Sequence, residues 1–137
     1  MKIPWAVYPF LLWTGSLRAE SAQDVVQQGL SEVRSGDVER GLSSLRRAAR
    51  LEPGNASVWI TLGLTAQEAR RYDDARDALE RALQQAPRSE TALYNLAMVY
   101  EKLRDWSRAR DAWTRFLALS PSADLKEIAQ RHVDRLE

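Results

Sequence analysis

The chain of 137 residues contains no cysteine and only one histidine, His132. The absence of thiols excludes disulfide scaffolds, thiol catalysis and cysteine-ligated zinc. A single histidine cannot supply a multi-histidine metal site, and it leaves little material for a catalytic triad. We therefore predict that the protein is not an enzyme and has no catalytic residues, metal ligands or cofactor. A pocket around His132 with aligned acidic partners would reopen that question.

The sequence also lacks an excess of charge of either sign, since it has 20 basic and 19 acidic residues. No strong net field favours a nucleic-acid partner, and we expect none. Arg46, Arg47 and Arg50 form a local cluster that could meet phosphate or an anionic lipid. Aromatic residues do not interleave with this cluster and no basic stripe continues it. We therefore interpret it as a solvated helix face.

The apolar run from Ile3 to Trp13 is too short to cross a bilayer, which takes about 20 residues. Lys2 precedes this run and small or polar residues follow it, an order typical of a secretory signal peptide. We place the cleavage after Ala19, so that residues 1–19 are removed and the protein is exported, periplasmic or secreted. Alternatively, this segment is retained as a hydrophobic anchor in the membrane, or the start of the chain is misassigned.

Prolines are scarce, and three of the five, Pro53, Pro87 and Pro121, stand 34 residues apart. Proline inside a helix removes a backbone hydrogen bond and costs about 3 kcal/mol. Even spacing therefore marks equivalent breaks between helices, and a period of roughly 20–50 residues is typical of a repeat array. Numbered 1 to 34 with proline at position 32, the repeats are residues 22–55, 56–89 and 90–123.

The three segments share a pattern of small and large residues. Small residues stand at positions 8 and 20, which allows two helices to approach closely. The middle segment resembles the tetratricopeptide repeat through Trp59, Leu62, Gly63, Tyr72, Ala75, Leu79, Ala82 and Pro87. The third segment matches the same pattern at Leu96, Tyr100, Ala109 and Pro121. The first segment is degenerate, because Gln28 and Glu32 replace apolar residues.

The resemblance implies an all-α, right-handed α-solenoid of three helix-turn-helix pairs. In the middle repeat we expect helices over roughly residues 57–70 and 73–86. Asp37, Asp73 and Asp105 stand where a carboxylate can cap the N-terminus of the second helix of each pair.

A stack of helix pairs leaves an apolar face at each end, and these faces need caps. Residues 124–137 are expected to form a C-terminal capping helix, whose apolar face consists of Leu125, Ile128, Ala129, His132, Val133 and Leu136. Phe116 is expected to fill space beneath this helix. At the other end, the polar first helix of the degenerate repeat can serve as its own cap.

By the same resemblance, the first helix of each pair lines a concave side, where such arrays bind an extended peptide or a partner helix. Positions 5 and 9 are apolar in all three repeats. The predicted partner-binding residues are Val26, Leu30, Ile60, Leu64, Tyr94, Asn95 and Met98. The alternative is that the apolar members of this set only pack between neighbouring helices. Some family members grip a C-terminal carboxylate, but only Asn95 matches their pattern, so we do not expect that mode.

The predicted function is a non-catalytic protein–protein interaction module that binds a protein or peptide segment outside the cytoplasm. The alternative is a membrane-tethered scaffold or assembly factor that retains its N-terminal apolar segment. His132, Trp106 and Trp113 are expected to have structural roles, with both tryptophans in core and turn packing. A scaffold of this kind does not name its partner, and the oligomeric state is left open.

Overall fold

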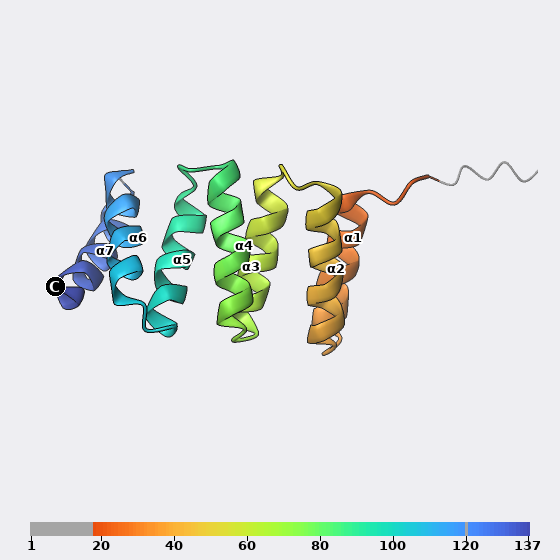
Figure 1. Cartoon of the computed structure of the whole chain (residues 1–137), viewed down its shortest axis with the longest axis horizontal. Coiled ribbons are helices and arrows are strands. Elements are labelled where there is room, and N and C mark those ends of the chain that lie inside the picture. The colour runs from red at the N-terminus through yellow and green to blue at the C-terminus, as the bar shows by residue number, and fades with distance from the viewer. Residues whose placement is uncertain (1–17, 120) are drawn as a thin grey trace, which may run out of the picture.

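The computed structural model of the protein describes residues 18–119 and 121–137. All regular structure in that part of the chain is helical. The predicted signal peptide or anchor, residues 1–19, lies almost entirely outside the described residues, so its fate stays a prediction. Figure 1 shows the helices in a row: α1 Ala22–Arg34, α2 Val38–Leu51, α3 Ala56–Glu68, α4 Tyr72–Gln85, α5 Glu90–Lys102, α6 Trp106–Ala118 and α7 Ala123–Leu136.

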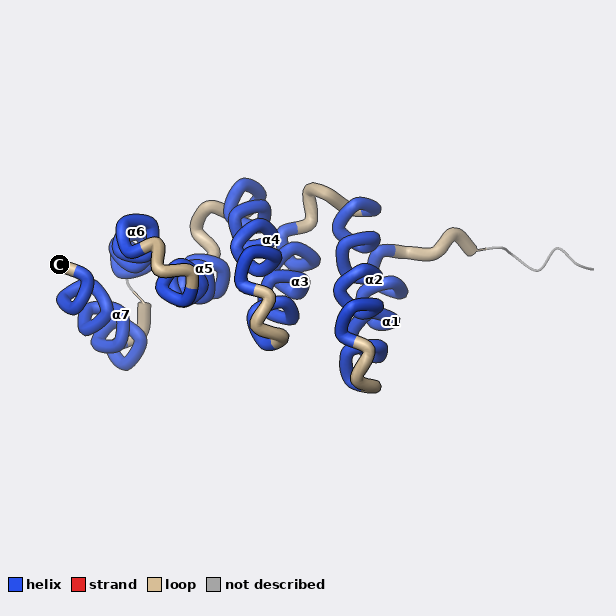
Figure 2. Tube along the Cα trace, turned by 60° about the horizontal axis from the view of Figure 1, so that its bottom comes forward, coloured by secondary structure: helices blue, strands red, loops and turns tan. Residues whose placement is uncertain are grey.

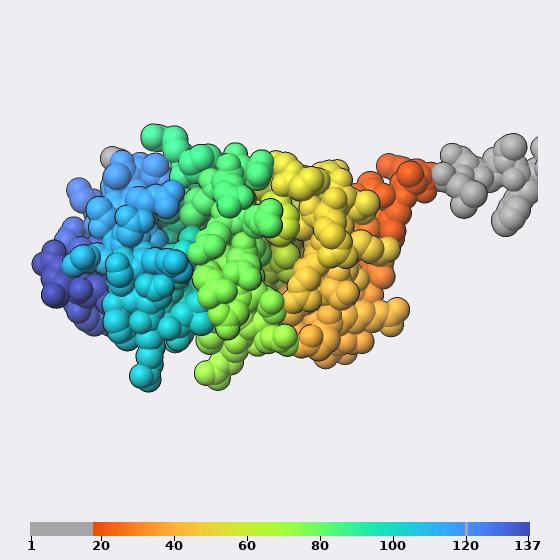
Figure 3. Space-filling model, viewed as in Figure 1, coloured from red at the N-terminus to blue at the C-terminus, as the bar shows by residue number. Residues whose placement is uncertain are grey.

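Consecutive helices pack as antiparallel pairs, α1 with α2, α3 with α4 and α5 with α6, while α7 packs on α6. The pairs are antiparallel because each is joined by a turn too short for any other arrangement. In Figure 3 the colours follow one another along the molecule, as expected when each pair contacts only its neighbours. The predicted all-α fold of stacked helix pairs with a C-terminal helix is confirmed.

The turn inside each pair contains one residue with left-handed backbone geometry. These residues are Gly36, Arg70 and Arg104, with φ angles of 96°, 60° and 59°, and they stand 34 residues apart. A left-handed residue ends a helix, because the next carbonyl and amide groups no longer line up with the ladder. The first helix of the middle repeat therefore ends at Glu68, close to the predicted end near residue 70.

Replacing Arg70 by glycine should stabilise the protein by about 1 kcal/mol, because glycine adopts this φ without the clash that a Cβ atom introduces. Urea denaturation of Arg70→Gly measures the gain. Arg88→Gly is the matched control, since Arg88 is also an exposed turn residue but does not have a positive φ. Equal destabilisation by both variants would contradict this account of the turn.

Two of the three predicted aspartate caps are present, and the third is wrong. The carboxylates of Asp37 and Asp105 accept the backbone N–H groups of Arg40 and Arg108, the third residues of α2 and α6, at 3.1 and 3.2 Å. In α4 the capping position holds Arg71, whose side chain makes no capping bond. Asp73 lies inside the first turn of α4, where it pairs with Arg76 at 2.9 Å. The prediction failed because α4 begins at Tyr72, the same repeat position at which α2 and α6 begin, so Asp73 lies one residue inside the helix.

Large side chains fill the seams between the pairs. Trp113 and Phe116 of α6 are buried, with 0% and 1% of their surfaces exposed, and the rings pack edge to face at 6.1 Å. The hydroxyl of Tyr100 donates to Glu80 Oε1 at 2.5 Å and joins α5 to α4. Burial and this hydrogen bond raise the pKa of Tyr100 well above its ordinary value. The tyrosine therefore stays protonated and serves as a donor between neighbouring repeats.

The N-terminal end of the described stack is polar. Glu32 accepts from the Ser44 hydroxyl at 2.6 Å and from the Gln28 amide at 2.9 Å. Arg40 lies 3.2 Å from the same carboxylate, and Arg47 donates to Gln28 at 3.1 Å. Gln28, Glu32 and Ser44 occupy positions that hold alanine, leucine or tyrosine in the other repeats. The degenerate first pair therefore presents hydrogen-bonding groups where a further repeat would dock.

The hydrogen bond from Ser44, followed by that from Gln28, holds the pKa of Glu32 below its ordinary value. A carboxyl group with a lowered pKa contributes stability above its unfolded-state pKa and loses it as the pH falls through the folded-state pKa. We expect Glu32→Gln to lower the melting midpoint at neutral pH, and the gap from the natural protein to close in acid. Thermal melts from about pH 7 to pH 3 test this, and a gap that stays constant with pH would contradict it.

The C-terminal end is closed by α7. Ala129 and Val133 are buried, with 0% and 8% exposed, and the remaining apolar members of the predicted face are partly buried. The opposite side of α7 is exposed and polar, and consists of Asp124, Lys126, Glu127, Gln130, Arg131 and Asp134. The helix therefore turns the apolar end of the last repeat into a solvated surface.

Candidate functional site

The first helices of the pairs lie together on one side of the row. Figure 2 shows α1, α3 and α5 on one side, and α2, α4 and α6 on the other. α3 and α5 also contact each other directly across the boundary between their repeats. Among the described residues no contact of similar extent links α4 with α6, so the stack is tighter on the side of α3 and α5. That tighter side is the inner, concave one.

The predicted partner-binding residues fall into two groups. Val26 is buried with 6% exposed, and the ring of Tyr94 packs edge to face on Trp113 at 5.2 Å and on Phe116 at 5.5 Å. Val26 is therefore part of the core, and Tyr94 packs within the third repeat. The other members are partly exposed, as Tyr94 is, and they are Leu30, Ile60, Leu64, Asn95 and Met98. Of these, Leu30, Ile60 and Met98 also pack against the core.

Three of the partly exposed residues come together in one cavity, which we call the α3–α5 hollow. It has a volume of about 470 Å³ and is lined by Leu64, Gln67, Glu68, Tyr72, Asn95, Met98 and Lys102. The oxygen Oε1 of Gln67 is buried here without a hydrogen-bond donor. An unpaired buried acceptor costs free energy, and because this oxygen has almost no accessible surface, a donor in the hollow reaches it only when the Gln67 side chain turns.

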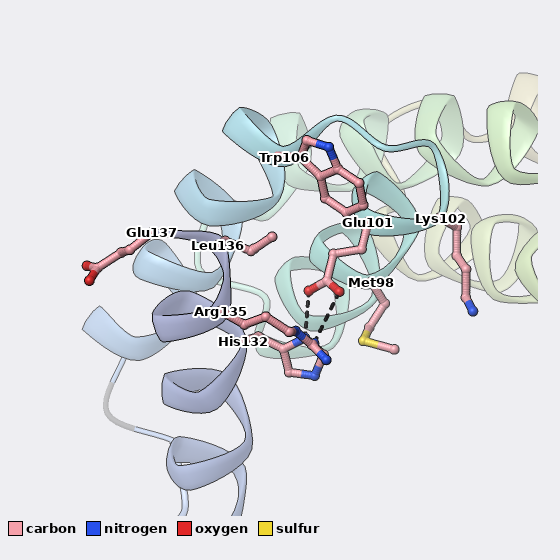
Figure 4. A pocket seen from close by; sticks show the side chains of 8 residues that line it. All are labelled: Met98, Glu101, Lys102, Trp106, His132, Arg135, Leu136 and Glu137. Atoms are coloured by element: carbon pink, nitrogen blue, oxygen red, sulfur yellow. Dashed lines mark hydrogen bonds and ion pairs between the residues drawn. The ribbon is translucent and has the colours of Figure 1, made fainter.

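A larger cavity, the α5–α7 hollow, lies beside it and was not predicted. It has a volume of about 750 Å³ and is lined by Met98, Glu101, Lys102, Trp106, His132, Arg135, Leu136 and Glu137 (Figure 4). Trp106 was expected in core and turn packing; it follows the turn as the first residue of α6, but 50% of its surface is exposed, so it is not part of the core. Val38 and Tyr72, at the same repeat position, pack against the core, so the sequence pattern pointed to burial.

His132 and Glu101 form the centre of the α5–α7 hollow. His132 Nδ1 lies 2.6 Å from Glu101 Oε1, and the indole N–H of Trp113 donates to the same oxygen at 2.7 Å. The imidazole stacks on the Trp113 ring at 4.6 Å. Arg135 approaches both groups, at 3.5 Å from Glu101 Oε2 and 2.7 Å from His132 Nδ1 (Figure 4). The cluster joins α5, α6 and α7 through one carboxylate.

This arrangement supplies the acidic partner that an enzymatic role for His132 would require. The histidine and Glu101 are only 18% and 16% exposed, and the carboxylate is already engaged by side chains from two other helices. None of the residues that line the hollow has a hydroxyl or thiol nucleophile. The cluster therefore has the features of a structural link between helices, which is the role expected for His132.

Metal binding and membrane spanning find no support in the part of the chain that the structure describes. No three residues of the acidic and histidine types are placed to share a metal ion across residues 18–119 and 121–137. In the same ranges, each helix is too short or too polar to cross a bilayer.

The family model for the tetratricopeptide repeat matches residues 26–90 and 60–124, two overlapping stretches that begin 34 residues apart. No curated protein sequence matches the chain.

Solved structures with the same fold are similar over most of their length. The Arabidopsis OM64 TPR domain is 16% identical with a TM-score of 0.69, and the match covers 85% of this chain and 93% of that one. The second TPR domain of human RPAP3, solved with an HSP70 peptide, is 16% identical with a TM-score of 0.70 over 84% and 93% of the two chains. PcrH, solved with the chaperone-binding region of PopD, is 15% identical with a TM-score of 0.70 over 83% and 89%.

Proposed function

Since the chain belongs to the tetratricopeptide repeat family, we propose that it is a non-catalytic interaction module that holds a segment of a partner protein on its concave side. The observation that carries this proposal is the α3–α5 hollow. It places the apolar side chains of Leu64 and Met98 beside the unpaired acceptor of Gln67. Apolar surface supplies affinity and a few fixed polar groups supply orientation, which is the usual composition of a peptide-binding cleft.

Two of the similar structures were solved with a bound peptide or protein region, RPAP3 with an HSP70 peptide and PcrH with a region of PopD. They support a binding role for the shared fold, and the residues of this chain define its own site. Of the predicted residues, we keep Leu30, Ile60, Leu64, Asn95 and Met98 as partner contacts. We leave out Val26 and Tyr94, because their side chains serve the packing of the repeats.

The double variant Leu64→Glu, Met98→Glu should reduce partner binding at least tenfold, because it replaces the two aliphatic side chains of the hollow with charges. The test is affinity capture from a native envelope extract, with the full chain as bait. Leu51→Glu is the matched control, since Leu51 is 51% exposed at the end of α2 and lines neither hollow. Both baits must retain the helical content and melting midpoint of a folded array. A partner held equally by all three baits would move the site away from the concave side.

We also propose that the protein acts outside the cytoplasm after loss of residues 1–19. This rests on the order of a basic start, an apolar run and small residues in the sequence. Mass spectrometry of the protein from its natural host distinguishes the alternatives. A chain that begins at Glu20 supports export and release, whereas an intact Met1 in the membrane fraction supports a tethered scaffold.

A further inference from the structure

The α3–α5 and α5–α7 hollows are built from the same repeat positions. Positions 9, 12, 13 and 17 form one wall, with Leu64, Gln67, Glu68 and Tyr72 in the first hollow and Met98, Glu101, Lys102 and Trp106 in the second. Positions 9 and 13 of the following element form the opposite wall. They are Met98 and Lys102 in the first hollow, and His132 and Leu136 of α7 in the second. The capping helix therefore stands where the first helix of a fourth repeat would stand.

We propose that the two hollows form one groove for an extended peptide, which places one bulky apolar side chain in each hollow and an acidic side chain between them. This inference rests on the proposed function and specifies the chemistry of the partner. It also gives α7 a second role, because the helix that closes the stack also forms a wall of the binding surface.

The two hollows are continuous because they share Met98 and Lys102. Each also offers its own apolar contact, Leu64 in the first and the half-exposed ring of Trp106 in the second. Packed helices lie about 8–10 Å apart, and an extended chain rises about 3.3 Å per residue. The two apolar anchors of the partner are therefore about three residues apart.

The polar atoms of the first hollow favour an extended partner over a helical one. Gln67 Oε1 has no donor, and the Asn95 amide nitrogen already donates to the Thr91 carbonyl at 2.8 Å. Asn95 lines the first hollow, and among the described residues its side-chain carbonyl oxygen accepts no hydrogen bond. An extended peptide has backbone N–H groups free to donate to such acceptors, whereas a helix has already used its own.

The charges along the groove set the charge pattern of the partner. Within the described residues no carboxylate lies within 4.0 Å of Lys102, and no cation lies within 4.0 Å of Glu68. In the second hollow, Glu101 is engaged by His132 and Arg135. Lys102, which stands between the anchors, therefore pairs best with an acidic side chain, and Glu68 pairs with a basic one before the first anchor. The acidic side chain is internal to the segment, because an apolar anchor of the partner lies on each side of it.

A random 12-residue peptide library displayed on phage, with peptide C-termini fused to the coat protein, tests the inference on the full chain. We expect enriched peptides to carry two bulky apolar residues about three apart, with Asp or Glu between them. Lys102→Glu should weaken these peptides about tenfold and enrich Lys or Arg at the same place. The matched control is Lys126→Glu, because Lys126 is exposed on α7 but lines neither hollow.

Trp106→Ala separates the two anchors. Peptides selected on this variant should lose the preference for a bulky apolar residue at the second anchor position and keep it at the first. The variant should still fold, because the Trp106 ring is half exposed. Peptides with a single anchor, bound equally by Trp106→Ala and Lys102→Glu, would overturn the inference. If Leu64→Glu, Met98→Glu removes those same peptides, the proposed function still stands. If no peptide binds the natural chain more tightly than it binds that double variant, both this inference and the proposed function are overturned.

Discussion

Gly63→Leu is expected to lower the stability of the array by about 3 kcal/mol or more, or about 10 °C in melting midpoint. A Cβ atom at this position would lie 2.6 Å from Leu79 Cγ and 2.8 Å from its Cδ2, and the Ala75 carbonyl lies 3.5 Å away. Leu79 is fully buried and has no room to withdraw. A leucine side chain would therefore separate α3 from α4, and both neighbouring repeats depend on that pair.

Gly54→Leu is the matched control for this substitution. The nearest atom to a Cβ at Gly54 is the end of the Gln85 side chain at 3.9 Å, and Gly54 has no positive φ. Its midpoint should stay within about 0.5 kcal/mol of the natural protein, as expected for a surface position. Thermal unfolding followed by circular dichroism compares the two variants. An unchanged midpoint for Gly63→Leu would show that the close approach at this glycine does not hold the middle repeat together.

Removal of residues 124–137 is expected to give a less stable protein that self-associates. The deletion takes away the buried Ala129 and Val133 and uncovers the surface of α6 around Trp113. The uncovered apolar area favours association with other copies. The deletion also removes His132 and Arg135, which leaves the partly buried carboxylate of Glu101 without its partners on α7 and lowers stability. Light scattering after size-exclusion chromatography measures the association.

The control for this deletion keeps α7 and changes only its outer side. Lys126→Ala with Gln130→Ala alters two exposed residues that lie outside the α5–α7 hollow. The variant should keep the mass and the melting midpoint of the natural protein. A truncated chain with the same mass and midpoint as this control would mean that α7 does not cap the array.

The periodic features of the fold were predictable from sequence, because they repeat and each copy supports the others. Prolines at 34-residue intervals located the breaks, and Gly63 marked a close approach that the structure places against Leu79. Errors arose where one repeat departs from the pattern. Asp73 was assigned as a cap because it follows the turn, but Arg71 holds the capping position in that copy.

The candidate site was predictable only in part. Leu64, Asn95 and Met98 follow from positions 6 and 9 of the repeat, and they line one cavity. The contact between Glu101 and His132 spans 31 residues and depends on where the capping helix lies. No spacing rule within a helix reports such a pair. Trp106 was misplaced because its two equivalents pack against the core, whereas the element beside it is a single helix and leaves the ring half exposed.

The polar network around Glu32 and the solvated side of α7 have a consequence for valency. Neither end of the described stack offers an apolar face on which another copy could continue the array. Under the proposed function, the described stack therefore offers a partner one inner surface, which holds one segment. Under the same proposal, strength through multiple attachment comes from the partner, by repeating the segment or by concentrating it, because the polar ends of the described stack do not favour end-to-end stacking of copies.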